Sequence, residues 1–188
     1  MLRTFVALEL PPEVRRLLAE TQASLRPATR AVRWVDPQGA HLTLKFLGPT
    51  PEDAVEPIGA ALRAGLAGHG AIRLRTGQPG TFPTPRAPRV LWLGLEGDVA
   101  RLGQLQDKVE AAIAPFGYPT EARPFSPHLT LGRVRQEAGN AERVAIGAAV
   151  GAAAAPRPVA FEVDAVSLML SELSPRGARY SPLLTVPL

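Results

Sequence analysis

The sequence His-Leu-Thr-Leu stands at residues 41–44 and again, letter for letter, at residues 128–131. The chain contains only 3 histidines, and the chance that two of them precede the same three residues is on the order of one in a thousand. A lone histidine in an apolar strand is most often structural, so it is the repetition that argues for a functional pair. The repeat also predicts a similar structural unit in each half of the chain.

Each motif is expected to lie on a strand with two different faces. Residues i and i+2 of a strand project to one side, so His41 shares a face with Thr43, and His128 with Thr130. The leucines take the opposite face, where burial under helices contributes roughly 1.5–3 kcal/mol each. If the halves are related by a pseudo-twofold axis, two imidazoles and two hydroxyls converge on one cleft.

Helices and strands alternate along the rest of the chain. Strands are expected over residues 3–10, 32–35, 41–47, 72–76, 90–95, 128–134, 159–170 and 180–188, and helices over 13–25, 53–66, 99–113 and 141–155. A loop rich in proline and arginine is expected over 81–89, and a turn at 174–177 joins the last two strands. Several connections are too short for parallel crossovers, so the pattern predicts an α+β fold with antiparallel pairs. No linker divides residues 1–188, which are expected to form one domain.

The composition is that of an ordinary globular protein. Apolar residues make up 46% and charged residues 20% of the chain, which argues against disorder. The chain has no cysteine, which excludes disulfides, thiolate zinc sites and cysteine nucleophiles and fits a cytoplasmic protein. We expect no secretory signal in residues 1–9 and no membrane span, because the longest weakly apolar run, 144–155, is too short. The net charge of +4 allows an anionic partner.

Two histidines and two threonines suit the cleavage of a cyclic phosphodiester. The in-line reaction needs a base to activate water and an acid to protonate the departing ribose oxygen, and histidine serves either role near neutral pH. Threonine hydroxyls can donate to the non-bridging phosphoryl oxygens. The motif lacks the second histidine or the carboxylates of a metal site, so we expect no metal and no cofactor.

Residues beside the motifs extend this hypothesis, each with a plainer alternative. Lys45 shares a face with His41 if the strand is regular and would then add charge near the phosphate; otherwise it is a solvated cation at a strand end. Phe46 and Trp92 could stack a nucleobase, or belong to the core. Arg86 and Arg89 could guide an RNA backbone or simply lie at the surface. The third histidine, His69, is expected to be a solvated surface residue.

The chain resembles the two-histidine phosphoesterase superfamily, and in particular the RNA 2′,3′-cyclic phosphodiesterases of the LigT/ThpR type, formerly called 2′-5′ RNA ligases. Both His-x-Thr-x motifs are intact, and the similarity extends over nearly the full length. The stretches that carry it are 3–11, 32–35, 41–48, 88–94 and 125–133, with 171–173, Gly177 and Tyr180 near the end.

The resemblance implies a bilobed, duplicated α+β fold with an antiparallel sheet in each lobe, helices outside and a central cleft. It implies hydrolysis of RNA 2′,3′-cyclic phosphate ends to 2′-phosphate and a weak, reversible 2′-5′ joining of tRNA halves. Separately, we expect the chain to be a monomer. His41 would be the proton donor to the 3′ oxygen and His128 the proton acceptor, although a symmetric site can exchange the two roles. The resemblance also makes Arg133 an anion contact. Strand parity points it away from the site unless a bulge redirects it.

Two other functions remain open at this point. One is an enzyme of the same superfamily that acts on a small cyclic nucleotide or a 2′-5′ oligonucleotide. The other is a non-catalytic module that binds RNA ends, against which the two intact motifs argue.

Overall fold

The computed structural model describes residues 1–174 and 177–188. Its strands are Leu2–Glu9 (β1), Val32–Trp34 (β2), His41–Thr50 (β3), Ile72–Phe82 (β4), Val90–Gly97 (β5), His128–Val134 (β6), Ala160–Val163 (β7), Ala165–Ser174 (β8) and Gly177–Pro187 (β9). Its α-helices are Pro12–Leu25 (α1), Val55–Leu66 (α2), Val99–Ile113 (α3) and Asn140–Ala152 (α4). The expected helices and most of the expected strands are therefore confirmed. Residues 175 and 176 of the expected turn lie outside the described residues.

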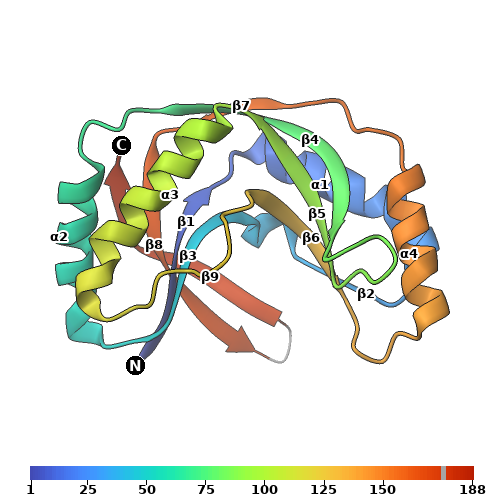
Figure 1. Cartoon of the computed structure of the whole chain (residues 1–188), viewed down its shortest axis with the longest axis horizontal. Helices are drawn as coiled ribbons and strands as arrows, with labels where there is room; N and C mark the ends of the chain where they lie inside the picture. Colours follow the sequence, from blue (N-terminus) through green and yellow to red (C-terminus); the bar gives the residue numbers. More distant parts are fainter. Residues whose placement is uncertain (175–176) are drawn as a thin grey trace.

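Two antiparallel sheets, each covered by helices, form the framework (Figure 1). The first has the order β3-β1-β8-β9, and the second has the order β2-β6-β5-β4-β7. Helix α2 packs on β9 and α3 on β3, whereas α1 packs on β6 and α4 on β4. The α+β fold with an antiparallel sheet in each lobe is confirmed. No helix within the described residues is long and apolar enough to cross a bilayer.

The two motif strands pair with their neighbours in the same register. In the first sheet Leu42 lies opposite Leu8 of β1, and in the second Leu129 lies opposite Leu93 of β5. The four motif leucines are buried, with exposures of 3% or less: Leu42, Leu44, Leu129 and Leu131. The expected duplication and the expected two-faced strands are therefore both present.

Helix α1 ties the second motif strand to the rest of the core. Pro12 begins the helix, where its missing N–H costs nothing, and apolar side chains such as Leu18 line its buried face. Gln22 on this face is also buried. Its Nε2 donates to the carbonyl of Val35 at 2.7 Å and to that of Leu131 at 3.0 Å. A polar side chain within the apolar face thus fixes the backbone of β6.

Two expected boundaries are wrong, for reasons that lie in the tertiary structure. The expected strand over 159–170 is two strands, because the chain leaves the second sheet after β7 and enters the first at β8. The Leu188 N–H donates to the Asp164 carbonyl at this crossing. Strand β4 continues to Phe82 instead of ending at Thr76, with a register shift between Thr76 and Pro79 that accommodates the glycines and proline there. Neither the crossing between β7 and β8 nor the register shift in β4 alters the period-2 pattern of the sequence, so neither could be predicted from that pattern.

We predict that Gln22→Leu lowers the free energy of unfolding by about 1–3 kcal/mol, because the buried Leu131 carbonyl and the partly buried Val35 carbonyl each lose a hydrogen-bond donor. Urea denaturation followed by circular dichroism measures the change. Glu20→Leu, at an exposed position on the same helix, serves as the control and should change stability by less than about 0.5 kcal/mol. Equal stabilities for the wild type and the Gln22 variant would contradict the prediction.

Candidate active site

Each His-Leu-Thr-Leu motif contains one extra residue relative to the neighbouring strand. In β3, Thr43 pairs with Ala7 and Lys45 with Val6, so Leu44 has no partner across the pair. In β6, Thr130 pairs with Trp92 and Gly132 with Leu91, so Leu131 has none. These are β-bulges at equivalent positions of the two motifs.

The bulge reverses the alternation of side chains that follow it. Phe46 and Arg133 are both exposed and line the same cleft as the histidines, whereas a regular strand would have turned them to the helices. Phe46 is 60% exposed, the largest value after Met1 among the big apolar side chains that the structure describes. Phe46 is therefore not a core residue, and the bulge that could redirect Arg133 is present.

The expected position of Lys45 on the face of His41 is wrong. The bulge turns Lys45 toward α3, where it is 2% exposed. Its ammonium donates to Glu110 Oε2 at 2.6 Å and to the Pro119 carbonyl at 2.8 Å. Lys45 borders the cleft, but its charge is neutralised in this buried ion pair and it is not a solvated cation either.

The polar residues of both motifs meet in one cleft of about 1220 Å³ between the two sheets. His41 and Thr43 come from β3, and His128 and Thr130 come from β6. Strands β3 and β6 are in contact, which brings the two motifs side by side. The cleft predicted from the repeat is therefore present and contains all four residues.

Both histidines are held by the same local bond. The Nδ1 atom of His41 lies 2.9 Å from the Gly39 carbonyl, and that of His128 lies 2.7 Å from the Ser126 carbonyl. A carbonyl oxygen only accepts, so Nδ1 donates in each ring and Nε2 is the nitrogen without a proton in the neutral form. Each imidazole can thus give or take one proton through Nε2.

Two aromatic rings pack against His41. Its ring centroid lies 4.5 Å from that of Phe5 and 4.8 Å from that of Tyr180, which meets it edge-on. Burial among these rings lowers the pKa of His41 from its ordinary value of 6.5, and the bond to Gly39 partly opposes this shift. His41 is therefore a desolvated imidazole that favours the neutral form in the free protein.

His128 has one aromatic neighbour, and Trp92 lies behind it. Phe82 meets the His128 ring edge-on with centroids 5.0 Å apart. Trp92 packs against Phe82, also at 5.0 Å, and the glycine at position 80 leaves room for its indole ring. The structure thus places Trp92 next to the ring that supports His128, while Phe46 stands at the cleft itself.

Arginines from several segments add positive charge to the cleft. Arg89 lines it, as does Arg133, whereas Arg86 is exposed on the same loop outside it. Arg3 and Arg123 also line it and were not singled out from the sequence. Only the closeness of Arg123 to His128 along the chain could have suggested it, and Arg3 depends on the register of β1. Tyr180 and Phe5 were missed for the same reason, because strand pairing alone brings them to His41.

His69 lies apart from the cleft, in the segment between α2 and β4. It is partly buried, not fully solvated as expected, and its backbone carbonyl accepts a bond of 2.6 Å from Arg101.

Among the described residues no group of three or more histidine, aspartate and glutamate side chains is arranged to hold a metal ion.

Comparison with known proteins gives a consistent picture. Residues 10–174 match the family model described as the 2′-5′ RNA ligase superfamily. The RNA 2′,3′-cyclic phosphodiesterase of Thermus thermophilus is 35% identical over 97% of this chain and 88% of its own length. The protein of the same name from Methanothermobacter thermautotrophicus is 32% identical over 95% of each chain.

Solved structures extend the similarity to three dimensions. E. coli LigT complexed with 3′-AMP superposes with a TM-score of 0.79 at 26% identity, covering 100% of this chain and 98% of the other. The crystal structure of a Thermus thermophilus protein gives a TM-score of 0.76 at 32% identity, covering 99% and 97%. With the family model matched over most of the chain and close relatives matched end to end, the chain belongs to the 2′-5′ RNA ligase superfamily.

Proposed function

We propose that residues 1–188 act as one bilobed unit that hydrolyses 2′,3′-cyclic phosphate ends of RNA to 2′-phosphates. The observation that carries this proposal is the pair of histidines in one cleft, each with Nδ1 bound to a carbonyl and Nε2 left for chemistry. The relatives named RNA 2′,3′-cyclic phosphodiesterase support the same activity.

The reaction needs two proton transfers on opposite sides of phosphorus. His128 Nε2 takes a proton from water as the water oxygen attacks phosphorus, and the bond from phosphorus to the 3′ oxygen breaks. Protonated His41 gives its Nε2 proton to that oxygen, so the product carries a 2′-phosphate and a free 3′ hydroxyl. The lowered pKa of His41 makes its imidazolium a stronger acid than that of an ordinary histidine. These roles rest on the family resemblance, since both rings are anchored alike.

The remaining residues of the cleft suit a bound nucleotide phosphate. The hydroxyls of Thr43 and Thr130 can donate to the non-bridging oxygens, where negative charge is held during the reaction. Arg133 supplies a guanidinium on the same face. The exposed ring of Phe46 offers a surface on which a nucleobase stacks. E. coli LigT has been solved with 3′-AMP and with ATP, which supports nucleotides as ligands of this cleft.

A second candidate is the hydrolysis of small cyclic nucleotides that are not attached to RNA. The single-nucleotide ligands of E. coli LigT favour this reading, whereas the arginines along the cleft favour a longer RNA.

We predict that kcat/KM is at least about tenfold higher for a short RNA with a 2′,3′-cyclic end than for 2′,3′-cyclic AMP, because added phosphates gain contacts with these arginines. Parallel assays at the same salt concentration measure the ratio. A ratio near one would favour the small substrate.

We predict that His41→Ala and His128→Ala each lower kcat on 2′,3′-cyclic AMP by about 10²–10⁴-fold, because each removes one proton transfer. Chromatographic separation of 2′-AMP from 3′-AMP measures both the rate and the bond that is cleaved. His69→Ala, outside the cleft, is the matched control and should keep wild-type turnover. EDTA should leave the rate unchanged. Wild-type turnover in either His41→Ala or His128→Ala would contradict the proposal.

The pKa of His41 is predicted to lie below 6.5 in the free protein, because burial penalises the imidazolium. The native state then binds fewer protons than the unfolded chain between the two pKa values. The contribution of His41 to the free energy of unfolding is therefore present above pH 6.5 and is lost as the pH falls through the native pKa.

NMR titration of the His41 ring measures this pKa directly. Inorganic phosphate should raise it, because a bound anion favours the imidazolium. In the assigned roles His41 must be protonated, so kcat/KM should fall as the pH rises through the His41 pKa and give one limb of a bell-shaped profile. A titration midpoint at or above 6.5 without phosphate would contradict the prediction.

A further inference from the structure

We infer that Lys45 is a positioning residue that holds the segment 117–127, and through it orients His128. The inference rests on the proposed function in one respect, namely that His128 acts through Nε2. The Ser126 carbonyl that fixes the His128 ring belongs to this segment. Lys45 lies on β3, the strand of His41, so the first motif strand helps to position both histidines.

Lys45 forms a buried ion pair with Glu110. The Lys45 side chain is 1% exposed and that of Glu110 is 10% exposed, with 2.6 Å between Nζ and Oε2. Gln106 Nε2 donates to the other carboxylate oxygen at 3.1 Å. A buried ion pair adds little net stability, because the cost of desolvating both charges opposes their attraction. Two apolar side chains of similar volume can replace such a pair without loss of stability. What an apolar pair cannot supply is the 2.8 Å bond from Lys45 to the Pro119 carbonyl.

The second motif strand has Gly132 at the position that corresponds to Lys45. Gly132 follows the bulge of β6 as Lys45 follows that of β3. A Cβ atom at Gly132 would lie 2.6 Å from Val32 Cγ1, because β2 pairs along that edge of β6. Strand β3 is the edge of its own sheet. Lys45 thus binds the segment at an edge where the other half of the molecule has a strand.

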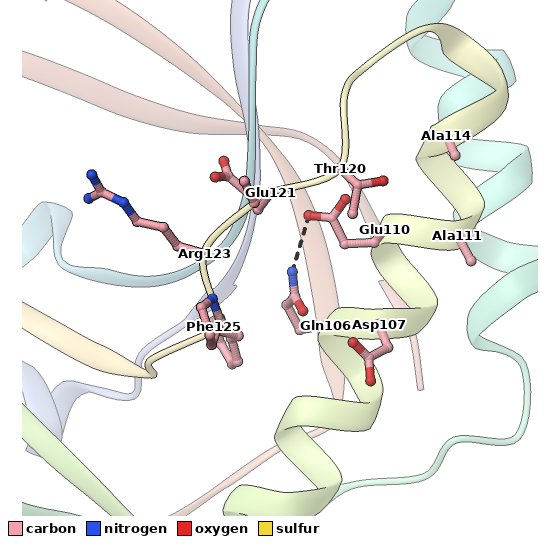
Figure 2. A pocket seen from close by; sticks show the side chains of 11 residues that line it. Gln106, Asp107, Glu110, Ala111, Ala114, Thr120, Glu121, Arg123 and Phe125 are labelled. Atoms are coloured by element: carbon pink, nitrogen blue, oxygen red, sulfur yellow. Dashed lines mark hydrogen bonds between the residues drawn. The ribbon is translucent and has the colours of Figure 1, made fainter.

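Apart from the Lys45 bond, the segment packs on the apolar core through Tyr118 and Phe125. A cavity of about 580 Å³ separates it from α3, with Gln106 and Glu110 on the helix side and Glu121, Arg123 and Phe125 on the segment (Figure 2). Three hydrogen bonds hold its first residues in the described part of the chain, and two of them involve β3. The Gly117 N–H donates to the Ala114 carbonyl at 3.1 Å. The Tyr118 hydroxyl donates to Thr50 Oγ1 at 2.9 Å, and the Pro119 carbonyl accepts from Lys45.

The next hydrogen bond from this segment, within the described part of the chain, is the one between the Ser126 carbonyl and His128. No helix or strand interrupts residues 117–127. The orientation of the His128 ring therefore depends on the course of the segment, which Lys45 holds at Pro119 and Phe125 holds against the core. The same segment carries Arg123 into the cleft.

We predict that Lys45→Met/Glu110→Met folds with near wild-type stability but loses kcat on 2′,3′-cyclic AMP by about 10- to 100-fold, as expected for a displaced catalytic group. Long-range ¹H–¹⁵N NMR of the imidazole rings reads the tautomers without any turnover. His128 should lose its Nδ1–H form, while His41, anchored through Gly39, should keep it. The matched control is Glu56→Met/Arg63→Met, an exposed ion pair on α2, which should change neither reading.

Glu110→Gln provides the contrasting variant. It keeps an acceptor for Lys45 and leaves the Lys45 to Pro119 bond in place, so the His128 tautomer should remain even if stability falls. A wild-type tautomer and kcat in the double variant would overturn the inference, as would equal changes at both histidines or loss of the His128 tautomer in Glu110→Gln. A wild-type protein without phosphodiesterase activity would refute the proposed function alone, because the tautomer of His128 is read independently.

Discussion

A β-strand presents its side chains alternately to two faces, and this site depends on breaking that alternation once in each motif. Before the bulge, the leucines must face the helices so that the histidines and threonines can face the cleft. After it, Phe46 and Arg133 join the histidine face while Lys45 turns inward. Because of the bulge, strand β3 directs Lys45 toward the helices and Phe46 into the cleft.

The two halves share this geometry but use it differently. The histidines have the same anchoring bond, yet His41 packs against two aromatic rings and His128 against one. Likewise, the residue after the bulge is a lysine in one strand and a glycine in the other. Such differences in surroundings are the physical means by which two identical motifs can take unequal parts in one reaction.

Much of the fold and the centre of the site could be predicted from the sequence, because both follow from local periodicity. The helix spans, the buried leucines and the shared face of His41 and Thr43 need only the repeat of a helix or strand. The bulges could not be predicted, since an extra residue is defined only against a partner strand. Lys45 was misplaced for that reason, and Tyr180 was missed because its contact with His41 spans most of the chain. The split of residues 159–170 depends likewise on which sheet the chain enters.

The helices are exchanged between the two halves of the molecule (Figure 1). Helix α1 follows a strand of the first sheet but packs on the second, and α3 follows a strand of the second sheet but packs on the first. Each sheet therefore depends for part of its cover on a helix that follows a strand of the other sheet. The two lobes therefore share their cover, and we expect them to unfold as one cooperative unit.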